Sequence, residues 1–475
     1  MRALSNNPTR IIVMLFLGAI VASLLYAYLS GRDEVAPPRP NILLIFTDDQ
    51  GYNGVSIFGS DIPTPNMDMI ARDGIRFNQA YVAAPICTPS RYALLTGKYP
   101  NRSQDQLLTA LMFSQDNDAQ RGIQSEEITL AEALQDSGYK TALIGKWHLG
   151  HGQEKFLPTR HGFDSFFGHT GGAVDYFTMK YGKIRDWYRN EELADYTGYA
   201  TDILADEAVD FVQKAQHDEN PFFLYLAFNA PHFGKPWDEQ KQRAVNVLQP
   251  DPKMRAQFSH IKDKTEREYA SMVVSLDIAI GRVFLALKAS GQDKETMVIF
   301  MSDHGGDPKY GGNNAPFRDG KFSLYEGGIH VPAMISWPGQ IKPGTVSEQM
   351  MSALDLFPTL CQIAGCKPDI TRFDGIDIGP HLFEGQSLDR DLFWQQQAAG
   401  NDPKWGLWHR ETISAYRHKN WKYMHTRDAG DVLFNLEIDP AETQNLAADY
   451  PEILADLKAK HQKILTTFPK RKDVQ

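Results

Sequence analysis

The stretch NILLIFTDD, residues 41–49, is a short apolar run that ends in two aspartates. A continuous apolar run of this length with a polar end is typical of a buried parallel strand. Three similar runs follow along the chain: TALI (141–144), FFLYLAF (222–228) and TMVIFM (296–301). Helical patterns lie between them: 129–137, 199–216 and 266–290. This alternation predicts an α/β fold with a large, mostly parallel sheet.

The character of the sequence changes after about Asp389. Residues 412–424 contain two short strand-like runs around a polar turn, residues 431–436 form another run, and residues 450–467 have the periodicity of an amphipathic helix. These patterns predict a small C-terminal α+β domain with an antiparallel sheet. We therefore expect three parts: a signal or anchor with a linker (1–39), a main domain (40–388) and a small C-terminal subdomain (389–475).

Composition excludes several classes of protein. The chain has 475 residues, of which 42% are hydrophobic and 23% charged, so a disordered or fibrous chain is excluded. Its net charge of −10 makes it a poor general binder of nucleic acid, because such binding depends on basic residues that neutralise phosphates. Three cysteines exclude a disulfide scaffold and a four-cysteine zinc site.

The N-terminus predicts export. Residues 11–29 carry no charge and follow Arg2 and Arg10. The stretch nearly reaches the ~20 residues of a membrane-spanning helix and exceeds the ~7–15 apolar residues of a cleaved signal. This favours an uncleaved membrane anchor, with a cleaved signal peptide as the alternative. The basic residues before it predict that the body lies outside the cytoplasm, in the periplasm or on the extracellular side.

Polar side chains gather where the predicted strands end, which is where open α/β sheets bind ligands. Asp48 and Asp49 offer hard oxygen ligands for calcium or magnesium, although a lone pair of aspartates is more often a solvated turn. The other clusters are Lys146 and His148 in GKWHLG, His232 after FFLYLAF, Asp303 and His304 in SDHGG, and Lys321 beyond them.

The segment PICTPSRYALLTG, residues 85–97, adds a possible nucleophile. Cys87 stands at the start of a predicted helix, whose free amides and partial positive charge suit a tetrahedral anion. Arg91 lies one helical turn further and can direct its guanidinium at the same anion. A lone cysteine, however, is usually a small buried hydrophobic residue.

CTPSR, with its flanking PI and YALLTG, resembles the signature of the type I sulfatases, and GYKTALIGKWH (138–148) resembles the second signature of that family. The Asp-Asp strand, SDHGG and K-x-x-x-Y-E-G-G follow the order of the family, and the resemblance extends over residues 40–470. It implies an alkaline-phosphatase-like fold and hydrolysis of sulfate esters. It also implies that a formylglycine-generating enzyme oxidises Cys87 to formylglycine. One hydroxyl of the hydrated aldehyde attacks sulfur, and the other then expels sulfate.

The resemblance also implies roles for the remaining site residues. One divalent cation, usually calcium in this family, is held by Asp48, Asp49, Asp303, His304 and residue 87. An imidazole is a soft ligand for calcium, which leaves magnesium open. Arg91 and Lys146 stabilise the hydrated aldehyde and the sulfate charge. His148 is the base for sulfate elimination, while His232 and Lys321 bind sulfate and assist departure of the alcohol.

We expect a sulfated carbohydrate as substrate, because residues 166–181 are rich in Gly, His, Asp and aromatic residues. Within them, His169, Asp175 and Tyr176 are predicted to form a sugar-binding rim. Two alternatives are a phosphonate monoester hydrolase or phosphodiesterase with the same nucleophile, and a non-catalytic binder of sulfated glycans. Cys361 and Cys366 are either a short-loop disulfide or two thiols. The sequence does not indicate the sugar, the sulfated position, exo or endo action, or the oligomeric state.

Overall fold

The computed structural model describes residues 39–113, 116–367, 373–396, 412–426 and 429–469. The chain divides into two units, Met1–Arg39 and Pro40–Gln475, and the second holds nearly everything described here. The predicted anchor at residues 11–29 lies outside the described residues and stays a prediction, as do the domain boundaries given above.

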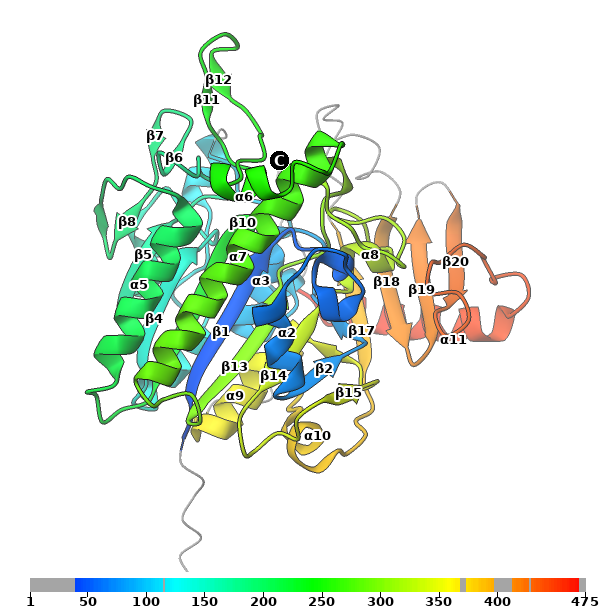
Figure 1. The fold of residues 1–475 in the computed structure, drawn as a ribbon. Helices are drawn as coiled ribbons and strands as arrows, with labels where there is room; N and C mark the ends of the chain where they lie inside the picture. Colours follow the sequence, from blue (N-terminus) through cyan, green and yellow to red (C-terminus); the bar gives the residue numbers. More distant parts are fainter. Residues whose placement is uncertain (1–38, 114–115, 368–372, 397–411, 427–428, 470–475) are drawn as a thin grey trace, which may run out of the picture. The chain divides into compact units, whose positions relative to one another are not determined.

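A ten-stranded sheet runs through the second unit in the order β15-β2-β14-β13-β1-β10-β4-β5-β8-β9 (Figure 1). Its five central strands are parallel: β13 (Thr296–Ser302), β1 (Asn41–Asp48), β10 (Phe222–Pro231), β4 (Lys140–Lys146) and β5 (Ser165–His169). The outer strands are β2 (Ile75–Phe77), β14 (Ala333–Ser336), β15 (Thr345–Ser347), β8 (Tyr188–Arg189) and β9 (Glu192–Leu193). The four runs predicted from sequence are thus neighbouring parallel strands, whose carboxyl ends meet at one edge.

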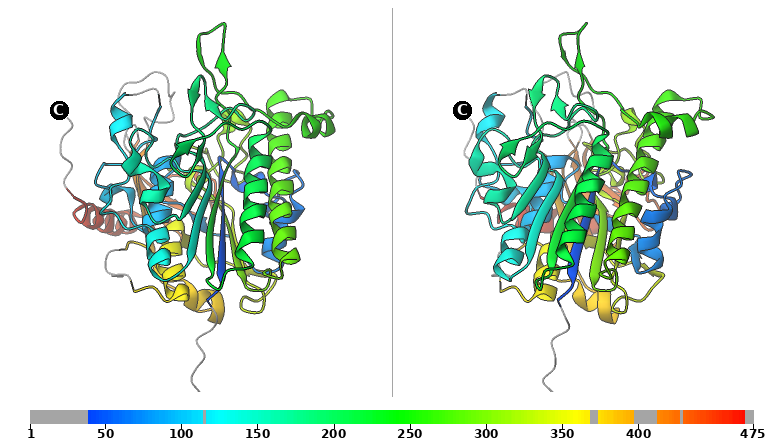
Figure 2. Two further views of the ribbon diagram at one scale, coloured as in Figure 1. Left: turned by 90° about the vertical axis from the view of Figure 1, so that its left-hand side faces the viewer. Right: turned by 60° about the vertical axis from the view of Figure 1, so that its left-hand side comes forward.

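Helices cover both faces of this sheet (Figure 2). On one side lie α2 (Pro65–Arg72), α5 (Ala200–Ala215) and α7 (Lys264–Ala289), and on the other lie α3 (Cys87–Thr96), α4 (Leu130–Asp136) and α9 (Leu356–Ala364). Alternate residues of β1 serve the two layers, because Leu43 packs into the first and Leu44 into the second. Both faces of β1 are therefore buried, which explains its uninterrupted apolar sequence.

Local sequence signals explain where the helices begin and end. Thr129 and Glu132 form a capping box before α4, which satisfies free amides of its first turn. Gly97 ends α3 in a left-handed conformation with φ of 65°. By length and composition α7 could cross a membrane, but 72% of its apolar window is buried, so it is a core helix.

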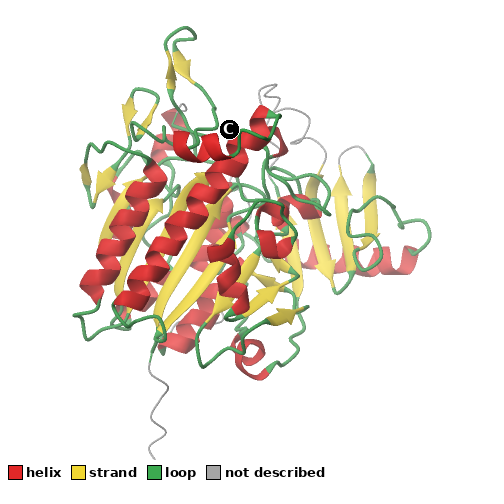
Figure 3. Ribbon diagram, viewed as in Figure 1, coloured by secondary structure: helices red, strands yellow, loops and turns green. Residues whose placement is uncertain are grey.

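The C-terminal part contains a four-stranded antiparallel sheet and a final helix (Figure 3). Its elements are β17 (Asp391–Gln395), β18 (Thr412–His418), β19 (Trp421–Thr426), β20 (Gly430–Asn435) and α11 (Pro451–Leu465). Trp394 and Met424 from this sheet pack against Tyr81 and Leu324 from the main part. The predicted fold class, a mostly parallel α/β sheet with a small antiparallel sheet after it, is confirmed.

Short elements complete the fold. They are the paired strands β3 (Ala80–Tyr81) and β16 (Met351–Ser352), β6 (Lys180–Tyr181) and β7 (Ile184–Arg185), β11 (Trp237–Asp238) and β12 (Arg243–Ala244), and the helices α6 (Pro252–Gln257), α8 (Glu326–Ile329) and α10 (Gly379–Glu384). Cys361 and Cys366 are thiols and are not joined by a disulfide.

A buried ionic joint connects the C-terminal sheet to the main part. The Lys422 ammonium of β19 is fully buried and lies 2.8 Å from Glu326 Oε1 and 2.8 Å from Glu442 Oε1. The Tyr81 hydroxyl donates to Glu326 Oε2 at 2.6 Å, and His330 Nδ1 lies 3.1 Å from the same oxygen. One lysine therefore compensates two buried carboxylates.

Candidate active site

The carboxyl ends of β1 and β13 bring the predicted acidic residues together. Asp48 is the last residue of β1, and Asp303 follows β13, the parallel neighbour of β1. Asp49 has a left-handed backbone with φ of 63°, and its amide donates to Asp303 Oδ1 at 3.2 Å. The chain therefore turns at the strand end, and the three carboxylates gather in a buried place.

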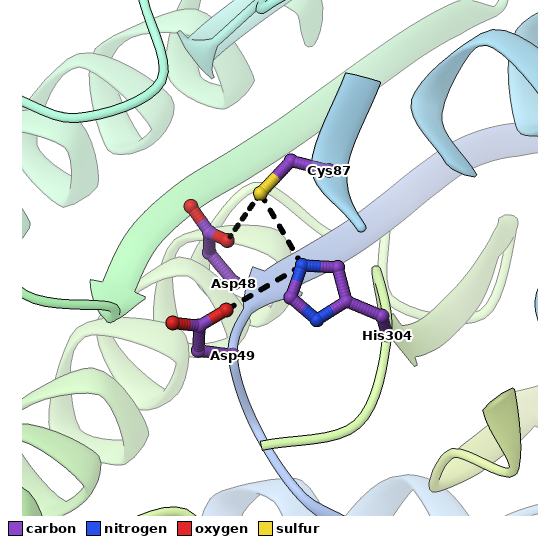
Figure 4. Close-up of side chains that lie close together, drawn as sticks. All are labelled: Asp48, Asp49, Cys87 and His304. Atoms are coloured by element: carbon purple, nitrogen blue, oxygen red, sulfur yellow. Dashed lines mark hydrogen bonds and ion pairs between the residues drawn. The ribbon is translucent and has the colours of Figure 1, made fainter. Parts of the chain in front are cut away.

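Helix α3 begins at this cluster and adds Cys87 to it (Figure 4). The Cys87 Sγ atom lies 3.2 Å from His304 Nε2 and 3.6 Å from Asp48 Oδ1. His304 Nδ1 donates to the Gly305 carbonyl at 2.9 Å, which leaves Nε2 to face Cys87 and the carboxylates. The sulfur atom marks where the oxygen atoms of a modified residue 87 would lie.

Four side chains here fit a divalent cation. Asp48, Asp49, Cys87 and His304 each present one ligand atom, and these atoms lie within 4.8 Å of one another. Asp49 Oδ2 is buried and has no hydrogen-bond partner among the described residues, which is costly unless another group compensates it. The donor set thus fits a metal. Asp303 stands next to this group, with Oδ1 3.4 Å from His304 Nε2, and its role as a ligand stays a prediction.

Three buried cations face the three carboxylates. Arg91 Nη2 lies 2.9 Å from Asp303 Oδ2. Lys321 Nζ lies 2.6 Å from Asp49 Oδ1. The Lys146 ammonium, in turn, donates to Asp48 Oδ2. Because all six groups are buried, each charge depends on its partner for compensation.

These cations act on the thiol as well. Burial alone would raise the pKa of Cys87, but Lys146 and Lys321 outweigh it and lower the pKa to about 6. Burial raises the pKa of Asp49 to about 8, against the opposing effect of Lys321. The environment at position 87 therefore favours a negative charge, as a site that stabilises an anionic oxygen must.

Lys146 and His148 do not lie on one face of an extended segment, as their alternate positions in GKWHLG would suggest. Strand β4 ends at Lys146, and His148 adopts a left-handed conformation with φ of 59°. The turn directs the imidazole so that Nε2 donates to the Leu111 carbonyl at 2.9 Å, while buried Nδ1 has no partner among the described residues. Burial, reinforced by Lys146, holds the pKa of His148 well below its usual value. A neutral imidazole with a free Nδ1 lone pair can accept a proton.

His232 also lies beside the carboxylates. Its Nδ1 donates to the Phe233 carbonyl at 2.8 Å, and its Nε2 lies 3.6 Å from Asp49 Oδ2. Burial, and then the charge of Lys321, hold the pKa of His232 well below its usual value. An anionic ligand beside it would favour the imidazolium form, which can donate a hydrogen bond from Nε2.

A pocket leads to these groups. Cys87, His148, His232 and Lys321 line its buried part, and more exposed residues form its outer part. The other lining residues are Ile86, Ala110, Leu111, Met112, Phe113, Gly172, Ala173, Tyr181, Phe233, Lys235, Asn246 and Phe322. Among the described residues, no carboxylate lines this pocket.

The predicted sugar-binding rim is not at the mouth of this pocket. His169 is fully buried in β5, in register with Lys146, and its Nδ1 donates to the Gly171 carbonyl. Asp175 is 5% exposed and accepts hydrogen bonds from the amides of the turn that follows it. Tyr176 is also fully buried, and its hydroxyl donates to the His232 carbonyl at 2.9 Å. The prediction of a solvent-facing rim from these residues is wrong, because their polar groups hold backbone in place.

Sequence reasoning missed the residues that do line the outer pocket. Phe113 lies in a loop, Tyr181 ends β6, and Phe233 and Lys235 lie in the segment between β10 and β11; none of them belongs to a motif. The one usable signal was the pair Gly171-Gly172. A Cβ atom on Gly172 would lie 2.7 Å from His148 Cε1, so a glycine is required where the chain passes the imidazole.

Comparisons with known proteins agree with this geometry. The family model described as Sulfatase matches residues 40–366, and a second, described as N-sulphoglucosamine sulphohydrolase, C-terminal, matches residues 316–467. The N-acetylgalactosamine-6-sulfatase of Rattus norvegicus is 35% identical over 379 residues, which cover 76% of this chain and 68% of that protein. Arylsulfatase A of Homo sapiens is 33% identical over 473 residues, which cover 92% and 84%.

A solved structure, that of Ps i-CgsB in complex with k-i-k-neocarrahexaose, superposes with a TM-score of 0.79 and 32% identity. The match covers 90% of this chain and 92% of that one. The expected alkaline-phosphatase-like fold is confirmed.

Proposed function

Since this chain belongs to the sulfatase family and is a sulfuric ester hydrolase, we propose that it removes sulfate from a sulfated carbohydrate by means of a formylglycine made from Cys87. One observation carries the proposal. Cys87 lies at the buried end of the pocket, within 3.6 Å of a candidate metal ligand, and buried cations lower its pKa to about 6. That environment suits a nucleophile that carries negative charge during reaction.

The two groups that the family uses fit these residues. Formylglycine supplies, as its hydrate, a hydroxyl that attacks sulfur and a second hydroxyl whose deprotonation releases sulfate. A divalent cation, with calcium as the expected ion, supplies positive charge that favours the ionised nucleophile and withdraws charge from the sulfate. Asp48, Asp49, Asp303 and His304 would hold this cation together with residue 87.

The other residues of the site position the ester and move its protons. Lys146 and Lys321 flank residue 87 and stabilise the charge of the sulfate group. His232 donates from Nε2 to the departing alcohol oxygen. His148, neutral with a free Nδ1 lone pair, takes the proton whose loss expels sulfate. Arg91 holds Asp303 in place through its ion pair with Oδ2.

Two relatives support a carbohydrate substrate. One is named an N-acetylgalactosamine-6-sulfatase, and the other was solved with a neocarrahexaose. The aromatic side chains of Phe113, Tyr181 and Phe233 at the outer pocket suit the apolar faces of sugar rings.

Maturation and location belong to the same proposal. A formylglycine-generating enzyme acts on the CTPSR segment, where Cys87 is followed by Pro89 and Arg91.

Residues 11–29 hold the protein at the membrane, with the active site in the periplasm or on the extracellular side. Full-length protein is expected in the membrane fraction, and deletion of residues 1–35 is expected to release a soluble enzyme. If expression of the full-length sequence gives a soluble protein that starts near residue 30, the segment is a cleaved signal peptide and not an anchor.

The nucleophile is tested by mass spectrometry of the tryptic peptide that ends at Arg91. We expect an aldehyde in place of the thiol at residue 87, together with turnover of 4-nitrophenyl sulfate. The matched variant Cys87→Ala should keep the unfolding temperature and lose turnover. Fully active protein that carries only unmodified cysteine contradicts the proposed mechanism, and a higher rate on 4-nitrophenyl phosphate than on the sulfate contradicts the proposed ester.

A further inference from the structure

Lys235 places a positive charge in the outer pocket without a carboxylate beside it. Its amide donates to the Val174 carbonyl at 3.2 Å, and its carbonyl accepts from the Gly182 amide at 2.8 Å. The backbone is therefore fixed from both sides. The ammonium lies 5.1 Å from the centroid of the Tyr181 ring and 5.6 Å from that of Phe233. No ion pair joins it to a carboxylate within the part of the chain that the structure describes.

This charge stands close to a cation of the catalytic centre. Lys321 Nζ lies 5.7 Å from the centroid of the same Phe233 ring, and Lys235 Nζ lies 5.6 Å from it. The two ammonium groups are therefore neighbours of one ring. Burial, followed by repulsion from Lys321 and Arg243, lowers the pKa of Lys235 to about 8. Two like charges on one aromatic ring are unfavourable, and an anion between or beside them removes that cost.

Lys235 differs from the other cations of the site in having no carboxylate partner among the described residues. In the catalytic centre Arg91, Lys146 and Lys321 each have a carboxylate partner. Lys235 has none among the described residues, although the whole chain carries a net charge of −10 and offers acidic groups in excess. The fold thus places an uncompensated cation in a pocket that opens onto residue 87.

We propose that Lys235 binds a second anionic group of the substrate, a sulfate or a carboxylate, in addition to the sulfate that is cleaved. This inference rests on the proposed function and narrows its substrate class to carbohydrates with at least two anionic groups. The scissile sulfate lies at Lys146, Lys321 and residue 87. The sugar ring packs against Phe233, whose ring lies near the ammonium groups of both Lys321 and Lys235. The second anion then binds Lys235.

The experiment compares three ligands as inhibitors of 4-nitrophenyl sulfate turnover by the full-length enzyme. The first is N-acetylgalactosamine 6-sulfate, with one anion. The second is the unsaturated uronate disaccharide of the same sulfated sugar, which adds a carboxylate. The third is N-acetylgalactosamine 4,6-disulfate, which adds a sulfate. We expect at least one dianionic ligand to have an inhibition constant roughly 10- to 100-fold lower than the first, the range that hydrogen bonds to charged groups span.

Lys235→Met keeps the length of the side chain and removes its charge. We expect it to reduce the advantage of the dianionic ligand to within about threefold, while Lys235→Arg keeps most of it. Lys183→Met is the matched control, because Lys183 also stacks on a ring, that of Trp237, but is exposed and paired with Glu239. It should leave all three inhibition constants unchanged.

The two dianionic ligands tell a carboxylate from a sulfate as the second group. No advantage for either in the unchanged enzyme overturns the inference, and so does an equal loss for all ligands in Lys235→Met. If the unchanged enzyme turns over no sulfate ester, the proposed function fails instead. Dissociation constants of the same three ligands, measured by calorimetry, then decide the role of Lys235 by themselves.

Discussion

Replacing Lys422 by methionine should destabilise the protein more than any change at an exposed lysine. Lys422 is fully buried between Glu326 and Glu442, at 2.8 Å from each. The change leaves Glu442 without its ion-pair partner and Glu326 with only the more distant Arg417, whose Nη1 lies 4.0 Å from Oε2. Removing one partner of a buried pair costs about 3–5 kcal/mol. With an unfolding entropy of about 2 cal/mol/K per residue, 1 kcal/mol corresponds to about 1 °C for a unit as long as Pro40–Gln475. We therefore expect the unfolding temperature to fall by about 3–5 °C.

The loss should depend on pH in a defined direction. Lys422, with His330 and Arg417, overcomes the effect of burial and keeps the pKa of Glu326 well below its usual value, while burial raises the pKa of Glu442 to about 7. Without Lys422 we expect the pKa of both carboxyl groups to rise in the folded state, with Arg417 and His330 still opposing the rise at Glu326. A raised pKa favours folding only while the group is protonated, so the penalty grows as pH rises. The difference from the unchanged protein should be largest near pH 8 and shrink toward about pH 5.

Activity should fall as well, because Glu326 is five residues from Lys321, which we propose binds the sulfate. A displacement of about 1 Å can cost roughly 100-fold in rate, so kcat/KM for 4-nitrophenyl sulfate should fall by up to that factor. The assay is differential scanning fluorimetry beside initial rates at a temperature where both proteins are folded.

Lys458→Met is the matched control, because Lys458 pairs with Asp431 at the surface and is 49% exposed. Such pairs contribute about 0–1 kcal/mol. A triple variant, Lys422→Met with Glu326→Gln and Glu442→Gln, should regain most of the lost stability. The reasoning is refuted if Lys422→Met lowers the unfolding temperature no more than Lys458→Met, or if the loss is larger at acidic pH.

Three further outcomes are expected. Gly172→Ala should lower kcat by roughly 100-fold or more with little change in unfolding temperature, because its Cβ would lie 2.7 Å from His148 Cε1 and displace the proposed base; steady-state rates and a melting curve check this. His169→Ala should reduce rates on an aryl sulfate and on a sulfated oligosaccharide equally and lower the unfolding temperature, since the side chain is fully buried; a loss confined to the oligosaccharide would restore it to the rim. Treatment with a chelator should abolish turnover and lower the unfolding temperature by about 3 °C against enzyme with calcium at 100 times its Kd, and added calcium should restore both; active protein without metal by elemental analysis would contradict the metal site.

Hydrophobic pattern predicted the fold because both faces of the central strands are buried. NILLIFT became β1 and TMVIFM became β13, and their parallel pairing brought Asp48 and Asp303 to one edge. The strand-end rule marked this edge as the ligand site, and the resemblance to the sulfatases implied that Cys87 and His304 join the aspartates there, where the structure places them. These predictions depend on one strong constraint, which is that strands apolar along their whole length must be buried on both faces, in the middle of the sheet.

The prediction of the sugar-binding rim failed because a sugar-binding loop and a buried strand can have the same amino-acid composition. The segment FFGHTGG around His169 has the aromatic, glycine and histidine content of a sugar-binding loop, yet it is strand β5 and its packed continuation. A Cβ atom on Gly168 would lie 2.0 Å from the Gly145 carbonyl oxygen, so the glycine allows close packing against β4. Lys235 was not predicted as a site residue, because segments far apart in the sequence form the pocket and no local pattern around Lys235 indicates it.

The charges of the catalytic centre explain how one arrangement can serve both metal and sulfate. Lys146 and Lys321 each hold a carboxylate of the metal-binding group, Asp48 and Asp49 respectively. A divalent cation on those carboxylates would take over their compensation, because its charge is larger and shared among all of them. Both ammonium groups then have positive charge to direct at an anionic ester beside residue 87. Loss of the metal should therefore weaken sulfate binding as well as catalysis, since the lysines return to the carboxylates, and the Kd of inorganic sulfate measured with and without calcium tests this coupling. An unchanged Kd after chelation would mean that the lysines reach sulfate independently of the metal.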